Sequence, residues 1–216
     1  MDSHFYYYLF IKIREHLQVT FTALFLASAV AIPLGIFLAK MRREKLAAIV
    51  LRIVGALQTV PGLALIALTT ALFVLVRPIF PLPTTGFFPG TLVLSIYAVL
   101  PMMNSSYGGI KGIPRSLLEV ARGMGMTRMQ ILYLVEFPIA FPEILTGFRT
   151  ALIWTFSSAT LTSLIGSGGL GDLILQGLRS MNVTLIACGT IPLMILAILF
   201  DSTISWMGSR LSPVRS

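Results

Sequence analysis

Long apolar runs constrain this chain more than any other feature. The run over residues 19–39 has no charged side chain and is followed at once by the basic cluster Lys40-Met-Arg-Arg-Glu-Lys45. About 21 helical residues cover about 32 Å, close to the roughly 30 Å hydrocarbon core of a bilayer. Only 11% of all residues are charged, against about 25% in soluble domains. The sequence therefore predicts an all-α integral membrane protein and excludes soluble enzymes, disordered chains and fibrous proteins.

The apolar runs predict five membrane spans within a single transmembrane domain over residues 1–216. The first run is interpreted as a retained span, because a cleavable signal peptide has a shorter apolar core. The second run is too long for one straight crossing and is interrupted by Pro61, so we expect one span broken there, with two short spans as the alternative. The expected spans cover residues 19–39, 46–76, 91–107, 144–165 and 184–207.

The basic residues predict the orientation of these spans. Lys and Arg are concentrated in cytoplasmic loops of membrane proteins. If the first loop, the polar segment 108–141 and the C-terminus share one side, that side holds all but four of the 16 basic residues. The exceptions are Lys12, Arg14, Arg77 and Arg179. We therefore expect the N-terminus outside and the C-terminus in the cytoplasm. The same rule explains the net charge of +8, so no nucleic-acid partner is expected.

No group of residues in the sequence predicts catalysis, a bound cofactor or a metal site. The single cysteine, Cys188, cannot form an internal disulfide or a thiolate metal site. The motif Gly166-Ser-Gly-Gly-Leu-Gly171 matches the dinucleotide fingerprint, but that fingerprint needs a preceding strand. Here an apolar span precedes it, so the glycines are interpreted as a tight external turn. They are Gly166, Gly168, Gly169 and Gly171.

The polar segment 108–141 predicts two short helices joined by a glycine turn. Ser116 with Glu119, and Thr127 with Gln130, both have the spacing of a capping box. Gly123 and Gly125 lie between the two helices. The first helix is short and largely apolar, so it must either pack on its own bundle or dock into a partner protein. The pattern alone leaves both possibilities open.

A resemblance to a known family bears on that choice. Glu119-Val-Ala121, three residues, Gly125, nine residues and Val135-Glu-Phe-Pro138 resemble the EAA loop of ABC importer permeases. Val120 replaces the middle alanine of the family pattern, and Val135 and Phe137 replace its isoleucine and leucine. The resemblance implies a coupling helix that sits in a cleft of a separate ATP-hydrolysing subunit. The implied contact residues are Glu119, Val120, Ala121, Arg122, Gly123 and Gly125.

The resemblance extends over nearly the whole chain and includes Gln58-Thr-Val-Pro61 and the glycine loop. It implies the five-helix transmembrane domain of a type-I ABC importer in a prokaryotic inner membrane. The implied partners are a second permease subunit, the ATPase subunit with its ATP and magnesium, and an extracytoplasmic substrate-binding protein. The chain is most similar to permeases for glycine betaine, choline and carnitine, on residues such as Ala151-Leu-Ile-Trp154. A permease for another small solute, such as an amino acid, is the alternative.

Four residues are candidates for the translocation pathway: Gln58, Pro61, Asn104 and Trp154. Polar residues at membrane depth usually face the bundle interior or a water-filled path, and broken helices line sites in transporters. The alternatives are a hydrogen bond between helices for Gln58 and ordinary packing for Trp154. Arg149 is expected to extend its charge to the membrane surface.

Two other functional classes stay open at this point. A secondary transporter would normally carry acidic residues or histidines deep in the membrane, whereas Glu143 and Asp201 are placed near the cytoplasmic ends of their spans. A non-transporting membrane scaffold would not need an EAA loop.

Overall fold

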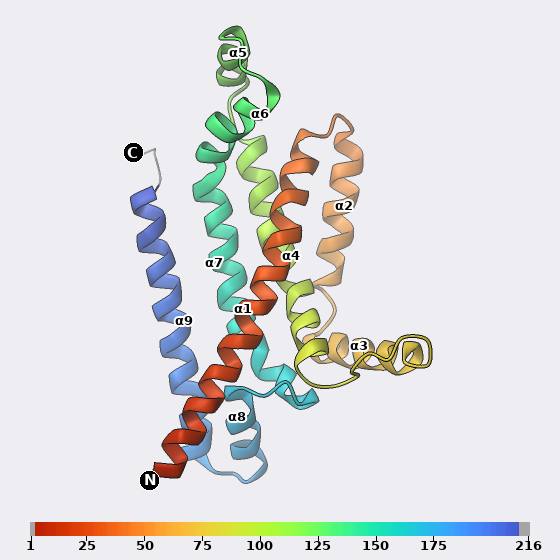
Figure 1. Ribbon diagram of the computed structural model, residues 1–216, viewed down its shortest axis with the longest axis vertical. Helices are drawn as coiled ribbons and strands as arrows, with labels where there is room; N and C mark the ends of the chain where they lie inside the picture. Colours follow the sequence, from red (N-terminus) through yellow and green to blue (C-terminus); the bar gives the residue numbers. More distant parts are fainter. Residues whose placement is uncertain (1–2, 212–216) are drawn as a thin grey trace.

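A computed structural model describes residues 3–211, and no β-strand occurs in that range. The long helices run roughly along one common axis, and short helices lie at both ends of the bundle (Figure 1). The all-α prediction is confirmed. The elements are α1 Ser3–Lys40, α2 Glu44–Leu57, α3 Gly62–Val76, α4 Phe87–Lys111, α5 Arg115–Gly123, α6 Arg128–Ile131, the π-helical turn Leu132–Glu136, α7 Phe137–Thr162, the 3-10 turn Ser163–Ile165, α8 Leu170–Arg179 and α9 Val183–Leu211.

Helices α1, α4 and α7 form the centre of the bundle. The main buried cluster takes Leu24 and Ala31 from α1, Met102 from α4, and Leu152 and Phe156 from α7, each at most 1% exposed. Helix α9 is attached to this centre mainly through α7 and α8. Because lipid tails are as apolar as leucine, close packing rather than exclusion from water holds such helices together.

Small residues allow α1 and α4 to approach closely. Ala23, Ala27, Ala31 and Gly35 recur every four residues along one face of α1, and the three alanines are buried. A side-chain carbon on Gly35 would lie 2.6 Å from the backbone oxygen of Met103 in α4. Helix α4 could not approach so closely if Gly35 carried a side chain.

The second apolar run folds as two helices, α2 and α3, whose axes differ by 95°. Residues 58–61, which we call the elbow, separate them, and α3 lies across the bundle (Figure 1). Four helices of the described chain are long and apolar enough to cross a membrane, and the α2–α3 pair raises the number to five if the pair forms one broken span.

Several helices extend beyond the expected spans. Helix α1 begins at Ser3 rather than near residue 19, and α7 begins at Phe137 rather than at residue 144. The polar segment expected at 108–141 is shortened accordingly, because α4 continues to Lys111. Charged residues such as Lys12 lower the hydropathy of these extensions without interrupting the helix. Arg215, counted above for the orientation, lies outside the described residues.

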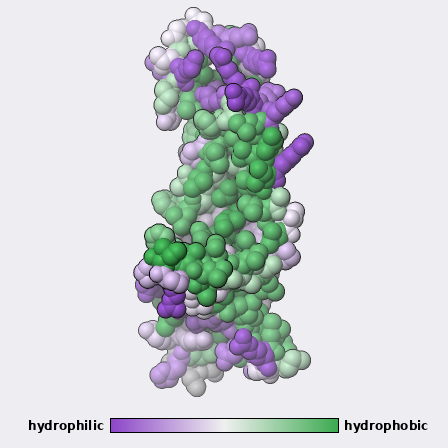
Figure 2. Space-filling model, turned by 90° about the vertical axis from the view of Figure 1, so that its right-hand side faces the viewer, coloured by the Kyte–Doolittle hydropathy of each residue, from purple (hydrophilic) through white to green (hydrophobic). Residues whose placement is uncertain are grey.

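The surface has an apolar belt between two polar ends (Figure 2). Exposed apolar side chains of the belt come from helices on several sides, including Phe25 of α1, Leu75 of α3 and Ile198 of α9. A belt of this kind matches the hydrocarbon layer of a membrane.

Candidate coupling surface and translocation pathway

Helix α5 stands beyond the helical bundle, where its contacts are chiefly with α6 (Figure 1). Its Ala121 is 2% exposed, whereas Val120 and Met124 are 59% and 69% exposed. Glu119 and Arg122 are exposed beside them. Leu118 and Ala121 of α5 thus pack toward the bundle. Val120, and Met124 directly after the helix, stay uncovered and leave a mixed apolar and charged surface open to a partner.

One of the two expected capping boxes is present and the other is not. The Thr127 hydroxyl accepts from the Gln130 backbone N–H at 3.3 Å, and the Gln130 side chain accepts from the Thr127 N–H at 2.8 Å. The box expected at Ser116 is wrong, because α5 begins directly after Pro114 and Ser116 lies inside its first turn. Gly125 follows α5 with φ +78° and turns the chain toward α6, a conformation that favours glycine.

Glu136 is a buried carboxylate that the sequence analysis did not single out. It lies at the end of the π-helical turn, is 5% exposed and accepts from Lys40 Nζ at 2.5 Å. This ion pair joins the end of α1 to the start of α7. Lys40 and Glu136 also line a polar hollow of about 480 Å³ with Arg42, Arg122 and Arg128. The base of α5 is thus strongly basic.

The glycine loop lies at the opposite end of the molecule from α5 (Figure 1). Gly166, Gly168 and Gly169 all have φ between +78° and +95°, which explains why glycines recur here. Gly171 lies in the first turn of α8, close to α7: a side-chain carbon there would lie 2.4 Å from the backbone oxygen of Thr160. An α-helix and a 3-10 turn precede this loop, so it lacks the strand that a dinucleotide site needs.

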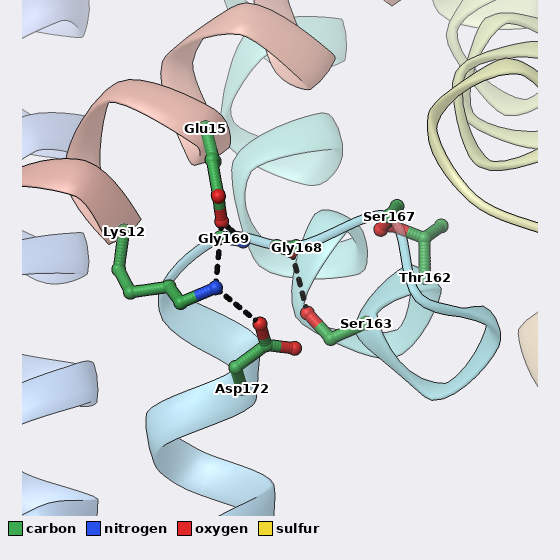
Figure 3. Close-up of polar contacts among 8 residues, drawn as sticks. All are labelled: Lys12, Glu15, Thr162, Ser163, Ser167, Gly168, Gly169 and Asp172. Carbon is green, nitrogen blue, oxygen red and sulfur yellow. Dashed lines mark hydrogen bonds and ion pairs between the residues drawn. The ribbon is translucent and has the colours of Figure 1, made fainter. Parts of the chain in front are cut away.

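Charged residues of α1 clamp this loop, as Figure 3 shows. The Glu15 carboxylate accepts from the Gly169 backbone N–H at 2.9 Å and from Lys12 Nζ at 2.8 Å. Lys12 also donates to Asp172 of α8 at 2.7 Å. The Ser163 hydroxyl donates to the Gly168 carbonyl at 2.8 Å, and Ser167 donates to the Thr162 hydroxyl at 2.7 Å. The clamp joins the start of α1 to α8 and to the end of α7.

Two alanine substitutions in this loop are expected to differ in their effect on stability. In Gly166→Ala the new side-chain carbon meets no atom within 4 Å. The substitution lowers the free energy of unfolding only through the left-handed backbone, by about 1 to 2 kcal/mol. Gly168→Ala adds a collision, because its side-chain carbon would lie 2.4 Å from Glu15 Oε2. We expect Gly168→Ala to lower the unfolding temperature in detergent more than Gly166→Ala does. Equal effects would contradict the clamp.

The elbow lies against α4 and α7. Gln58 Nε2 donates to the Tyr97 carbonyl of α4 at 2.7 Å, and the Tyr97 hydroxyl donates to the Val60 carbonyl. A side-chain carbon on Gly62 would lie 3.3 Å from Leu161 of α7. The interhelical hydrogen bond considered for Gln58 is therefore present.

The other pathway candidates lie on the faces that lead to the elbow. Asn104 is exposed and lies two turns from Tyr97 along α4. Trp154 is 52% exposed and lies two turns from Leu161 along α7. Residues seven apart share a helix face, so Asn104 and Trp154 lie on the faces of α4 and α7 that carry Tyr97 and Leu161. A translocation path shared by these residues with Gln58 and Pro61 stays a prediction.

Arg149 makes an ion pair instead of extending to the membrane surface as expected. Its Nε and a terminal nitrogen donate to both carboxylate oxygens of Asp201 in α9, at 2.8 and 2.9 Å. Because α7 begins earlier than expected, Arg149 lies near the middle of that helix rather than near its end.

Comparison with known proteins identifies the family. Residues 31–213 match the model of the binding-protein-dependent transport system inner membrane component. The chain is 38% identical to the carnitine transport permease protein OpuCB of Listeria monocytogenes, over 95% of this chain and 88% of that protein. It is 38% identical to the choline transport system permease protein OpuBB of Bacillus subtilis strain 168, over 94% and 88%. It is 33% identical to the osmoprotectant import permease protein OsmY of Salmonella typhimurium, over 93% of this chain and 80% of that protein.

The fold also matches a solved structure. The model superposes on a chain of the inward-facing MetNI methionine ABC transporter with a TM-score of 0.86, over 100% of both chains and at 24% identity. That similarity shows the fold, which is the transmembrane domain of a type-I ABC importer. The resemblance found in the EAA loop is thereby confirmed at the level of the family. This chain belongs to the family of binding-protein-dependent transport system inner membrane components.

Proposed function

We propose that this chain is the permease subunit of an ATP-driven importer for quaternary-amine osmoprotectants such as glycine betaine, carnitine and choline. The observation that carries the proposal is α5, which projects beyond the bundle and exposes Val120 and Met124 beside Glu119 and Arg122. A helix with that surface fits a cleft in a separate subunit. The solute class is supported by relatives named for carnitine, choline and osmoprotectants.

In this proposal, ATP hydrolysis by partner subunits drives transport. In the proposed cycle two ATPase subunits bind ATP and magnesium, close, and move the α5 helices of two permease subunits. The implied contact residues, Glu119 to Gly125, form the contact between the permease and the ATPase subunit. This chain itself binds neither ATP nor metal in the proposal.

The orientation proposed is N-terminus outside and C-terminus in the cytoplasm. The α5 end then faces the ATPase, and its basic residues Lys40, Arg42, Arg122 and Arg128 lie on the side where membrane proteins concentrate positive charge. The glycine loop and α8 face outward, toward the substrate-binding protein.

The elbow supports a pathway between two permease subunits. The 14 residues of α2 cover about 21 Å, so the elbow lies well inside the apolar belt. Thr59 and Pro61 are exposed there, and the first turn of α3 has no side-chain cap. Non-helical backbone at membrane depth is tolerated only where protein or water covers it. A second copy or a related permease, with an aqueous path between the two subunits, supplies that cover.

The proposal is tested by reconstituting the permease with its ATPase and binding protein in liposomes. We expect uptake of labelled glycine betaine that requires ATP and that unlabelled choline and carnitine compete for. Competition by methionine instead would favour an amino-acid permease. Uptake that is driven by an ion gradient and continues without ATP would favour a secondary transporter and contradict the proposal.

A further inference from the structure

Pro101 leaves one backbone carbonyl of α4 without its helical partner. In an α-helix each carbonyl accepts from the N–H four residues later, and proline has no N–H. Pro101 lies inside α4, so the carbonyl of Tyr97 loses that donor. An unpaired polar group within a membrane is costly. Gln58 Nε2 supplies the missing donor at 2.7 Å from the elbow.

The same tyrosine returns a hydrogen bond to the elbow. Its hydroxyl donates to the Val60 carbonyl, which belongs to the break between α2 and α3 and has no helical donor there. Two carbonyls therefore lack a helical donor, that of Tyr97 in α4 and that of Val60 in the elbow. Each accepts a hydrogen bond from a side chain of the other element. Gln58 and Tyr97 form a reciprocal pair.

The α2–α3 unit has further contacts at its two ends. At the start of α2 the exposed Glu44 carboxylate accepts from Lys111 Nζ of α4 at 2.8 Å. Ala47 is the buried residue of α2, and Ile66, Thr69 and Phe73 are those of α3. At the far end of α3, Phe73 stacks on Phe88 of α4, with ring centroids 5.8 Å apart. Helix α3 is therefore held to α4 at both ends, by hydrogen bonds at the elbow and by an aromatic stack at Phe73.

We propose that Gln58 and Tyr97 are positioning residues that fasten the elbow to α4, so that the elbow and α4 move as one body during transport. The inference rests on the proposed function, since it assigns these residues to the transport cycle. Gln58 borders the proposed path, and its amide nitrogen fixes the path's geometry instead of binding solute. Without these two hydrogen bonds, α4 can move when the ATPase subunits close while the elbow stays in place.

The first test measures solute transported per ATP hydrolysed in proteoliposomes. Gln58→Met keeps the length of the side chain and removes the donor, and Tyr97→Phe removes only the hydroxyl. We expect each to lower the ratio about fivefold, the effect of one net hydrogen bond. The double variant should fall little further, since both act on one contact. An unchanged ratio in both single variants would overturn the inference.

A matched control removes a tyrosine hydroxyl of α4 without touching the contact. The Tyr107 hydroxyl makes no hydrogen bond with residues 3–211. Tyr107→Phe should therefore keep the wild-type ratio.

Pro101→Ala separates positioning from stability. It restores an N–H that can satisfy the Tyr97 carbonyl within α4, but it does not join α4 to the elbow. In Gln58→Met/Pro101→Ala we expect the unfolding temperature to recover and the transport ratio to stay low. Recovery of both would show that Gln58 only satisfies a carbonyl, and would overturn the inference. Pro101→Ala alone, which retains Gln58, should keep the wild-type ratio.

A second measurement does not depend on the solute. Hydrogen exchange of the backbone amides at 58–62, followed by mass spectrometry on the detergent-solubilised complex, should be about fivefold faster in Gln58→Met and in Gln58→Met/Pro101→Ala. Unchanged exchange would overturn the inference even where wild-type uptake is normal. Faster exchange in a protein that transports no glycine betaine would support the fastening and contradict the proposed solute.

Discussion

Glu119→Arg is expected to abolish ATP-dependent uptake while the helical bundle stays folded. Glu119 is exposed on α5, beyond the bundle, so its replacement leaves the core intact. In the proposed complex the new charge is carried into the ATPase cleft beside Arg115 and Arg122. A mismatched charge in an interface costs several kcal/mol, and about 3 kcal/mol lowers affinity about 100-fold.

Co-purification of the ATPase with the tagged permease measures this effect directly, alongside uptake. Lys45→Glu is the matched control, because it reverses an exposed charge at the same end of the bundle but outside α5. It should leave ATPase capture and uptake near wild type. Normal capture of the ATPase by Glu119→Arg would contradict the assignment of α5 as the coupling helix.

Asp201→Ala is expected to destabilise the protein by about 3 kcal/mol, because it leaves Arg149 unpaired between α7 and α9. The two side chains are 34% and 22% exposed, and two parallel hydrogen bonds join them. This pair joins the middle of α7 to α9. Unfolding temperature in detergent measures the loss.

A double-mutant cycle separates the pair from its parts. The cycle uses Arg149→Leu, Asp201→Leu and the double variant of the two. The double variant removes both charges and leaves none unpaired, so it should be more stable than Asp201→Leu. If the double variant is less stable than either single variant, the ion pair is not what holds α9 to α7.

The sequence predicted most of what depends on local pattern. Apolar run length indicated the spans, because a bilayer fixes the length of a crossing helix. The spacing from Glu119 to Pro138 indicated the family, and Thr127 with Gln130 indicated the start of α6. The box at Ser116 is absent because α5 starts at Arg115, directly after Pro114 and two residues earlier than that box requires.

Contacts between distant residues could not be predicted in the same way. Glu136 pairs with a lysine 96 residues away, and Arg149 with an aspartate 52 residues away. Pro101 alone indicates that the Tyr97 carbonyl needs a donor, but not that Gln58 supplies it. The extension of α1 to Ser3 is not apparent in the sequence because Lys12 and Glu15 lower the local hydropathy. In the fold Lys12 pairs with Asp172, and Glu15 accepts from the Gly169 backbone N–H. Such pairings depend on how the helices assemble.

The pairing of Lys12 with Asp172 also means that the two partners are synthesised at different times. The two residues are 160 positions apart, and ribosomes add about 5 to 20 residues per second. Lys12 therefore waits about 8 to 30 seconds after its own synthesis before its partner on α8 exists. Glu15, one helical turn away and within 2.8 Å, is available from the start. The nascent chain thus carries a counter-ion for Lys12 from the start, and the same Glu15 carboxylate later also accepts from the Gly169 N–H of the glycine loop.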